Sequence, residues 1–282
     1  MDELAKNALV GDALKALLYE VSVNPKPGLV DPVSSGPHPD MDVFTFIDST
    51  VSLRQYFTSC VGQGAAFHGD DLRQLFGSIR PIGVQAEHEM FAATNGVNTH
   101  KGAIFSLGIL VTAEAYRLNH QQLTVTNVVQ LMLRGLTASD FKNLDRQPAD
   151  LLTAGERQYL RYGTKGIRGE AETGYPTVIS VGLPTLRAAK GNQNQRLLDT
   201  LMMLVGHSVD TNLVKRAGNE DVVEWAHVQA KRYFDLGGSQ TEDGMAFLTQ
   251  LNQTFTDRNL SLGGSADLLI LTIFLGLREG II

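Results

Sequence analysis

The chain has 282 residues but only one cysteine, Cys60, and it lacks any long apolar run. A single thiol cannot form an intrachain disulfide or a cysteine-based zinc site, which excludes a secreted disulfide scaffold. No stretch reaches the length that a membrane span needs, and the first residues have no signal-peptide core. These absences predict a cytoplasmic protein that does not enter a membrane.

Positive charge is not in excess either, because 24 Lys and Arg residues stand against 30 Asp and Glu residues, giving a net charge of −6. This balance argues against nonspecific binding to nucleic acid or to a membrane surface. The chain also lacks the phosphate loop of P-loop enzymes, the dinucleotide-binding glycine pattern, the kinase signatures and the Gly-x-Ser-x-Gly elbow. Any phosphate site must therefore come from a local cluster of another kind.

The sequence has no alternating apolar and polar segment long enough to predict a strand, no fixed repeat and no linker. It predicts an all-α fold, a single multi-helix globular domain over residues 1–282 with glycine-rich active-site loops. A turn is expected at Arg80-Pro81, because proline interrupts a helix. Apolar residues at helical spacing predict helices at residues 4–21, 40–67, 70–76, 82–94, 103–118, 125–135, 148–160, 177–189, 193–206, 219–236, 240–252 and 268–277.

The segment 96–108 is a glycine-containing loop that turns into an apolar helix. Asn98 or Thr99 can accept a hydrogen bond from the free N–H groups of the first helical turn. His100 and Lys101 follow at once, although cations are disfavoured at a helix N-terminus unless an anion binds there. The segment is either an ordinary capped core helix or a phosphate site, and its two cations favour the phosphate site.

The segment 168–172 places Arg168, Glu170 and Glu172 at every second position, between glycines. In an extended loop such side chains point the same way, so we expect the two carboxylates and the guanidinium to converge. A solvated charged loop is the alternative.

Two further segments carry acidic residues near a predicted helix start. His38 is followed by Asp40 and Asp42, and oxygen ligands of this kind hold magnesium beside a polyphosphate. In the segment 263–267, Ser265 is the expected N-cap, and the preceding glycine pair would let a phosphate approach the backbone. Plain helix capping is the alternative in both segments. A fifth polar cluster, at residues 207–212 with Lys215 and Arg216 after it, receives no role.

Together these segments resemble those of the triphosphoribosyl-dephospho-coenzyme A synthase family. The resemblance spans Pro25 to Asp267 in the family's order, and it departs from the family pattern at Pro37, where a small residue such as alanine is expected. The matching pieces are residues 25–31, 35–42, 96–102, 168–172 and 263–267.

The resemblance implies a transferase that joins the triphosphoribosyl group of ATP to the 2′-hydroxyl of 3′-dephospho-coenzyme A and releases adenine. The product is the prosthetic-group precursor for the acyl carrier protein of citrate lyase, and a sister branch serves malonate decarboxylase. The α-linked product of a β-nucleotide implies one displacement with inversion. Another ATP-dependent transferase or small-metabolite kinase, and a nonenzymatic nucleotide-binding regulator, are the rival interpretations.

The resemblance also implies roles for the residues of these segments, with Mg²⁺ bound beside ATP. The expected phosphate-binding residues are Lys26, Asn98, Thr99, Lys101, Arg168, Gly263, Gly264 and Ser265. The expected magnesium ligands are Asp40, Asp42 and Asp267. Glu170 or Glu172 would be the general base or charge stabiliser, with His38 and His100 as competing proton carriers. The implied partners are a transferase that passes the product to the apo-acyl carrier protein, and a second copy of the chain in a homodimer.

Overall fold

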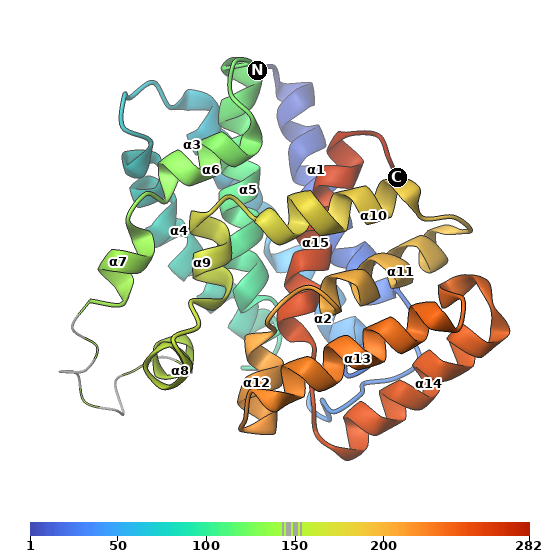
Figure 1. The fold of residues 1–282 in the computed structure, drawn as a ribbon. Coiled ribbons are helices and arrows are strands. Elements are labelled where there is room, and N and C mark those ends of the chain that lie inside the picture. Colours follow the sequence, from blue (N-terminus) through green and yellow to red (C-terminus); the bar gives the residue numbers. More distant parts are fainter. Residues whose placement is uncertain (143, 145–147, 149–151, 153) are drawn as a thin grey trace.

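The computed structural model describes residues 1–142, 144, 148, 152 and 154–282, and every regular element in these ranges is a helix (Figure 1). The all-α prediction is confirmed for this part of the chain. The α-helices are α1 (Glu3–Ser22), α2 (Val43–Ser52), α3 (Arg54–Ala66), α4 (Leu72–Ala93), α5 (Lys101–Asn119), α6 (Val125–Met132), α7 (Leu136–Asp140), α8 (Ala154–Tyr162), α9 (Gly166–Glu172), α10 (Leu183–Ala188), α11 (Gln193–Val205), α12 (Thr211–Ala217), α13 (Asp221–Asp235), α14 (Glu242–Asp257) and α15 (Gly263–Arg278). A π-helix, η2 (Val178–Gly182), and a 3₁₀ helix, η3 (Gly238–Gln240), complete the set.

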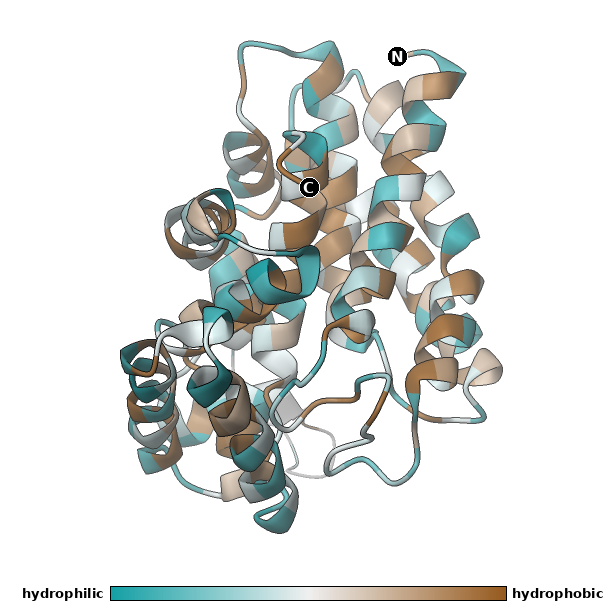
Figure 2. Cartoon of the chain, turned by 90° about the vertical axis from the view of Figure 1, so that its right-hand side faces the viewer, coloured by the Kyte–Doolittle hydropathy of each residue, from teal (hydrophilic) through white to brown (hydrophobic). Residues whose placement is uncertain are grey.

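The helices α5 and α15 bury more residues than the other described helices and form the centre of the fold. Helices α3, α4 and α6 pack on α5, while α1 and α11 pack on α15. The contact between α3 and α5 is close because both helices carry glycine there, and a Cβ atom at Gly64 would lie only 2.3 Å from the carbonyl oxygen of Thr112. Figure 2 shows the hydrophobic colour concentrated on these inner helices, as burial of apolar surface requires.

Both central helices begin at the end of the molecule that lies away from the two chain termini (Figure 1). The N-terminal amine donates to Asn119 Oδ1 over 3.1 Å, which fixes the last turn of α5 beside the start of α1. The first turns of α5 and α15 therefore lie at the opposite end, with the long segment between α1 and α2. The free backbone N–H groups of both helices point toward this end.

Three predictions about the elements are wrong. The expected turn at Arg80-Pro81 is absent, because α4 continues through Pro81 as one helix. An interior proline costs about 3 kcal/mol, and burial of Leu75, Ile79 and Met90 on the same helix offsets this. The expected helix 40–67 is divided at Leu53 into α2 and α3. The helices α9 and α12 form where the sequence predicts irregular segments.

The predicted helix 148–160 coincides with α8 only in its second half, and residues 149–151 and 153 lie outside the described residues. None of the helices in the described part of the chain is both long and apolar enough to cross a membrane.

Candidate active site

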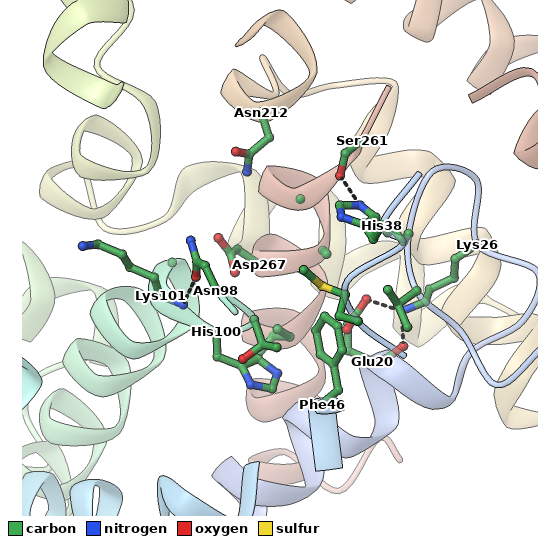
Figure 3. Close-up of a pocket in the computed structure, with 18 of the residues that line it drawn as sticks. Glu20, Lys26, His38, Phe46, Asn98, His100, Lys101, Asn212, Ser261 and Asp267 are labelled. Atoms are coloured by element: carbon green, nitrogen blue, oxygen red, sulfur yellow. Dashed lines mark hydrogen bonds and ion pairs between the residues drawn. The ribbon is translucent and has the colours of Figure 1, made fainter. Parts of the chain in front are cut away.

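Two cavities lie side by side at the starts of α5, α12 and α15. Their volumes are about 330 Å³ and about 550 Å³. They form one two-part cleft, because five residues line both: Asn98, Lys101, Gly102, Asn212 and Asp267. Figure 3 shows the smaller cavity, in which side chains from segments far apart in the sequence face one another. Two ligands bound here would meet at the shared wall.

The start of α5 supplies part of that wall. Asn98 Oδ1 accepts the backbone N–H of Lys101 over 3.2 Å, which confirms the predicted hydrogen bond to the first turn, while the N-cap position of α5 is His100. The Lys101 side chain turns away from the smaller cavity (Figure 3) and forms a 2.7 Å ion pair with Glu87. Because this ion pair is largely exposed, it holds the lysine weakly and leaves it able to meet a phosphate.

Thr99 and His100 turn inward from the same loop. The Thr99 hydroxyl donates to Ser49 Oγ over 2.7 Å, and Ser49 Oγ lies 2.7 Å from His100 Nδ1. The imidazole is buried, meets the Phe46 ring edge to face, and has no partner at Nε2 within the described part of the chain. Burial, with a smaller contribution from Lys26, lowers the pKa of His100 to about 3. The ring is therefore neutral near pH 7 and cannot readily store a proton.

His38 is the second histidine of the smaller cavity, and both of its ring nitrogens have partners. Arg216 Nη2 lies 3.1 Å from Nδ1, and Ser261 Oγ lies 3.1 Å from Nε2. Since a guanidinium can only donate, Nδ1 accepts, and Nε2 carries the hydrogen that Ser261 receives. Burial and the Arg216 charge lower the pKa of His38. These contacts fix the orientation and the neutral state of the ring.

The start of α15 is organised by the buried Asp210, which sequence analysis left without a role. Its Oδ2 accepts the backbone N–H of Ser265 over 2.7 Å and the Ser265 hydroxyl over 2.9 Å. Its Oδ1 caps α12 by accepting from Asn212 and Leu213. The predicted N-cap role of Ser265 is therefore wrong, because α15 begins two residues earlier and its serine hydroxyl is a donor.

The glycine pair at this helix start lies against two polar side chains. A Cβ atom at Gly263 would lie 2.7 Å from Asn212 Nδ2, and one at Gly264 would lie 3.0 Å from Asp210 Oδ1. Because both residues lack side chains, the polar groups of Asn212 and Asp210 can approach the backbone of α15. They occupy the space that the sequence predicted for a phosphate.

Asp267 lies four residues after the first residue of α15, Gly263. It is the acidic residue of the shared wall. Figure 3 shows its carboxylate beside Asn98, and a Cβ atom at Gly102 would lie 2.0 Å from Asp267 Oδ2. Within the described ranges no donor or cation is paired with it. Burial, followed by the charges of Asp210 and Glu20, raises the pKa of Asp267 well above its usual range.

Lys26 is placed differently from the phosphate-binding role that the sequence predicts. It lines the smaller cavity, but its ammonium group is paired with the Glu20 carboxylate and donates to the Glu20 carbonyl over 2.7 Å. Both side chains are almost fully buried, at 1% and 3% exposure. Breaking such a pair leaves an uncompensated buried charge, so Lys26 is held in the wall of the cavity and is not free to bind a phosphate.

The expected convergence of the segment 168–172 is wrong, because this segment is helical and positions two apart on a helix do not face each other. Glu170 alone lines the larger cavity, where its Oε1 accepts the Thr177 N–H over 2.7 Å and burial raises its pKa. Glu172 accepts from Thr137, and Arg168 forms a 2.6 Å ion pair with Asp140. Neither Glu172 nor Arg168 lines either cavity.

The three predicted magnesium ligands are not brought together. Asp42 caps α2 through a capping box with Thr45 and lies outside both cavities. Asp40 is exposed at the smaller cavity, and Asp267 lies on the shared wall. No group of three or more His, Cys, Asp or Glu side chains suited to a metal ion occurs among the described residues.

Two lysines that sequence analysis did not assign are better placed than Lys26 for anions. Lys215, on α12, is exposed at the smaller cavity and has no ion partner in the described part of the chain. Lys165, before α9, lines the larger cavity and donates to Thr137 over 3.2 Å. The signal for Lys215 was its place directly after the polar cluster at residues 207–212.

These features define an all-helical protein with a polar, two-part cleft suited to two phosphate-bearing small molecules. The model of the ATP:dephospho-CoA triphosphoribosyl transferase family matches residues 7–281, and the chain belongs to this family. The activity of the family accords with two ligands that meet at one wall.

Three curated proteins are similar to this chain. A probable 2-(5″-triphosphoribosyl)-3′-dephosphocoenzyme-A synthase of Lactiplantibacillus plantarum is 64% identical over 274 residues, which cover 97% of this chain and 98% of the relative. Protein CitXG of Leuconostoc mesenteroides subsp. cremoris is 50% identical over 99% of this chain, which spans 60% of that protein. A probable synthase of the same name from Citrobacter koseri is 40% identical over 93% of this chain and 88% of its own length. No solved structure matches the chain.

Proposed function

We propose that this chain transfers the triphosphoribosyl group of ATP to the 2′-hydroxyl of 3′-dephospho-coenzyme A and releases adenine. Membership of the family supports the reaction and both substrates. The observation that carries the proposal is the pair of cavities with one shared wall, since a direct transfer needs both substrates bound at once with their reacting atoms in contact.

The two cavities differ in a way that suggests which substrate each one takes. The smaller cavity combines the apolar side chains of Phe46 and Met41 with the exposed Lys215, which suits a flat base joined to a polyphosphate. We assign ATP to this cavity. The larger cavity, with Lys165 and Glu170 on its walls, is assigned to dephospho-coenzyme A.

The chemistry requires displacement at the anomeric carbon of the ATP ribose. A transfer that inverts this carbon in one step needs a base beside the attacking hydroxyl and stabilisation of a positively charged, oxocarbenium-like transition state. The carboxylate of Glu170 can supply negative charge from the larger cavity. Asn98 and Lys101, at the start of α5, would position phosphate oxygens at the shared wall.

Magnesium would enter together with the triphosphate. In nucleotide sites Mg²⁺ commonly uses one or two carboxylates, phosphate oxygens and waters, so one exposed carboxylate at the smaller cavity is enough for this ion. Asp40 at the smaller cavity would hold it, and the bound ion would neutralise phosphate charge. Asp42 is committed to capping α2 and is removed from this role.

The biological context is part of the proposal. The product would serve as the prosthetic-group precursor of the citrate lyase acyl carrier protein, with malonate decarboxylase as the alternative destination. A transferase acting on the apo-acyl carrier protein would receive the product, and the chain would work in the cytoplasm as a homodimer.

One incubation tests the reaction. Purified protein with ATP, Mg²⁺ and dephospho-coenzyme A should release adenine in equal amount to the conjugate, measured by chromatography and mass spectrometry. Coenzyme A with its 3′-phosphate should be a much poorer acceptor, because the phosphate crowds the attacking hydroxyl. ADP or inorganic phosphate in place of adenine would indicate a kinase, and binding without ATP turnover would indicate a regulator. Either result would overturn the proposal.

A further inference from the structure

Most carboxylates of the cleft are already committed to a partner. Glu20 is paired with Lys26, Asp210 accepts from the first turns of α12 and α15, and Glu170 accepts from Thr177. Asp40 is exposed and lines only the smaller cavity. Asp267 is the carboxylate that lies on the shared wall and, among the described residues, has no donor or cation paired with it.

We propose that Asp267 is the general base that takes the proton from the attacking 2′-hydroxyl of dephospho-coenzyme A. This inference rests on the proposed function and replaces the magnesium role that the sequence implied for Asp267. The shared wall is where a nucleophile bound in the larger cavity must meet the ribose bound in the smaller one. A half-buried acceptor without a partner in that position can receive the hydroxyl hydrogen without first breaking another hydrogen bond.

The surroundings of Asp267 raise its pKa and so make its carboxylate a stronger base than an exposed one. Its carboxylate is pressed against Gly102 at the start of α5, where the missing side chain leaves room for it. The charged and titratable groups around it are Glu20 on α1, Lys26 before α2, His100 and Lys101 at the start of α5, Glu170 on α9, Tyr175 before η2 and Asp210 before α12. Lys26 and Lys101 each have an acidic partner, so the acidic neighbours dominate and favour the protonated form.

The step is balanced within the two substrates. The O2′–H bond of dephospho-coenzyme A breaks as the proton moves to an Asp267 oxygen, and O2′ forms a bond to C1′ of the ATP ribose. The C1′–N9 bond breaks, and its electron pair leaves with adenine, which gains a proton from solvent. Asp267 then returns its proton to solvent, so the proton lost by the hydroxyl equals the one gained by adenine.

The other candidate bases are less suited in this structure. His38 is neutral, but Arg216 already donates to its Nδ1 and its Nε2 carries a hydrogen. His100 is buried, and its low pKa opposes proton uptake near neutral pH. Glu172 lies outside both cavities.

Asp267→Asn is the direct test, because it removes the charge with almost no change in volume. We expect the turnover number for adenine release to fall by about 10²–10⁴-fold. The dissociation constants of ATP and dephospho-coenzyme A, measured by calorimetry, should change little. The wild-type rate should fall with decreasing pH as the base is protonated, and this acid limb should be absent from the residual rate of the variant. Asp71→Asn, a cap of α4 outside the cleft, is the matched control and should behave as the wild type.

Three results would overturn the inference while leaving the proposed function intact. The first is wild-type turnover in Asp267→Asn, and the second is an unchanged acid limb in that variant. The third is a loss of activity that excess Mg²⁺ restores, which would place Asp267 on the metal. Failure of the wild-type protein to release adenine would instead overturn the proposed function itself. Circular dichroism and the ATP dissociation constant confirm that the variant is folded.

Discussion

The starts of α2 and α15 both carry an aspartate that the sequence marks as a metal ligand, yet the two side chains have opposite surroundings. Asp42 accepts the Thr45 N–H over 2.9 Å in a reciprocal capping box, and it is fully exposed to solvent outside both cavities. Asp267 has no such donor in the described part of the chain, and it lies between the two cavities of the cleft.

The comparison shows how a structural acid differs from one held ready for a ligand. The hydrogen bonds from Thr45 lower the pKa of Asp42, so its charged form is stabilised in the folded protein. Burial and acidic neighbours raise the pKa of Asp267, so its charged form is disfavoured. Folding alone does not explain why an unfavourable group would be kept, whereas function at a binding site does.

Among the changes that test this contrast, the largest loss of turnover should come from replacing Gly102, whose missing side chain leaves room for the Asp267 carboxylate. In Gly102→Ala the new Cβ would lie 2.0 Å from Asp267 Oδ2, so the carboxylate must rotate away. We expect turnover to fall by about 10²-fold, the cost that a misplacement of about 1 Å can have. Adenine release measures the effect, and circular dichroism verifies the helical content.

Gly77→Ala provides the control for that change, because a Cβ at Gly77, also on a helix, meets nothing within 4 Å. This variant should turn over as the wild type does. Unchanged turnover in Gly102→Ala would mean that the position of the Asp267 carboxylate does not matter for the reaction.

The central helices could be predicted from the sequence because long apolar runs indicate that they are buried. The helices α5 and α15 are almost wholly apolar between their first and last turns. The bounds of α5 were expected closely, whereas α15 begins at Gly263 and was expected only from residue 268. The short helices α9 and α12 were not, since each has few apolar residues and glycine or polar neighbours. The form of α9 depends on the burial of Ala171 by other helices. The helix α12 depends on its cap Asp210, whose other oxygen is held by the distant Ser265.

The sequence predicted which residues line the cleft better than it predicted which side chains they pair with. The sequence indicated that Asn98, His38 and Asp267 belong to one cleft, and the structure brings all three to it. It could not indicate that Lys26 is paired with Glu20 or that Arg168 is paired with Asp140. Whether a charged side chain is free depends on which acid the fold places beside it, and a single sequence does not contain that information.

A second contrast, between the two glutamates of α9, predicts a smaller effect. Glu170 lines the larger cavity, whereas Glu172 is held by Thr137 outside both cavities. Glu170→Gln should reduce turnover by about tenfold through loss of negative charge near the transition state, which corresponds to about 1.4 kcal/mol. Glu172→Gln should stay near the wild type. Equal losses in the two variants, in steady-state kinetics, would contradict this difference.

Removal of a lysine at the smaller cavity should change the ATP dissociation constant by about the same factor or less. Lys215→Ala removes an exposed ammonium group at the smaller cavity, and we expect the ATP dissociation constant to rise by about three- to tenfold. Lys190→Ala, an exposed lysine outside both cavities, should leave this constant unchanged in calorimetry. An unchanged constant in Lys215→Ala would move the triphosphate away from α12.

The smallest effects concern stability, where the two aspartates should give opposite signs. Asp42→Ala removes a cap and should lower the free energy of unfolding by about 1 kcal/mol, while Asp42→Asn keeps the cap and should be close to neutral. Asp267→Asn removes a carboxylate whose ionised form is disfavoured in the fold, so it should raise the melting temperature. A gain of about 1 kcal/mol would correspond to about 2–4 °C in a protein of this size.

The pH dependence separates this stabilisation from other causes. Because the folded-state pKa of Asp267 is raised, the native state binds more protons than the unfolded state between the two pKa values, and stability falls as pH rises through that window. The penalty is complete above the folded-state pKa and absent below the unfolded one. The difference in melting temperature between Asp267→Asn and the wild type should therefore be greatest above the folded-state pKa of Asp267 and shrink toward about pH 4, near the unfolded-state pKa. A constant difference at every pH would show that the gain does not come from the charge of Asp267, and the contrast with Asp42 would then rest on geometry alone.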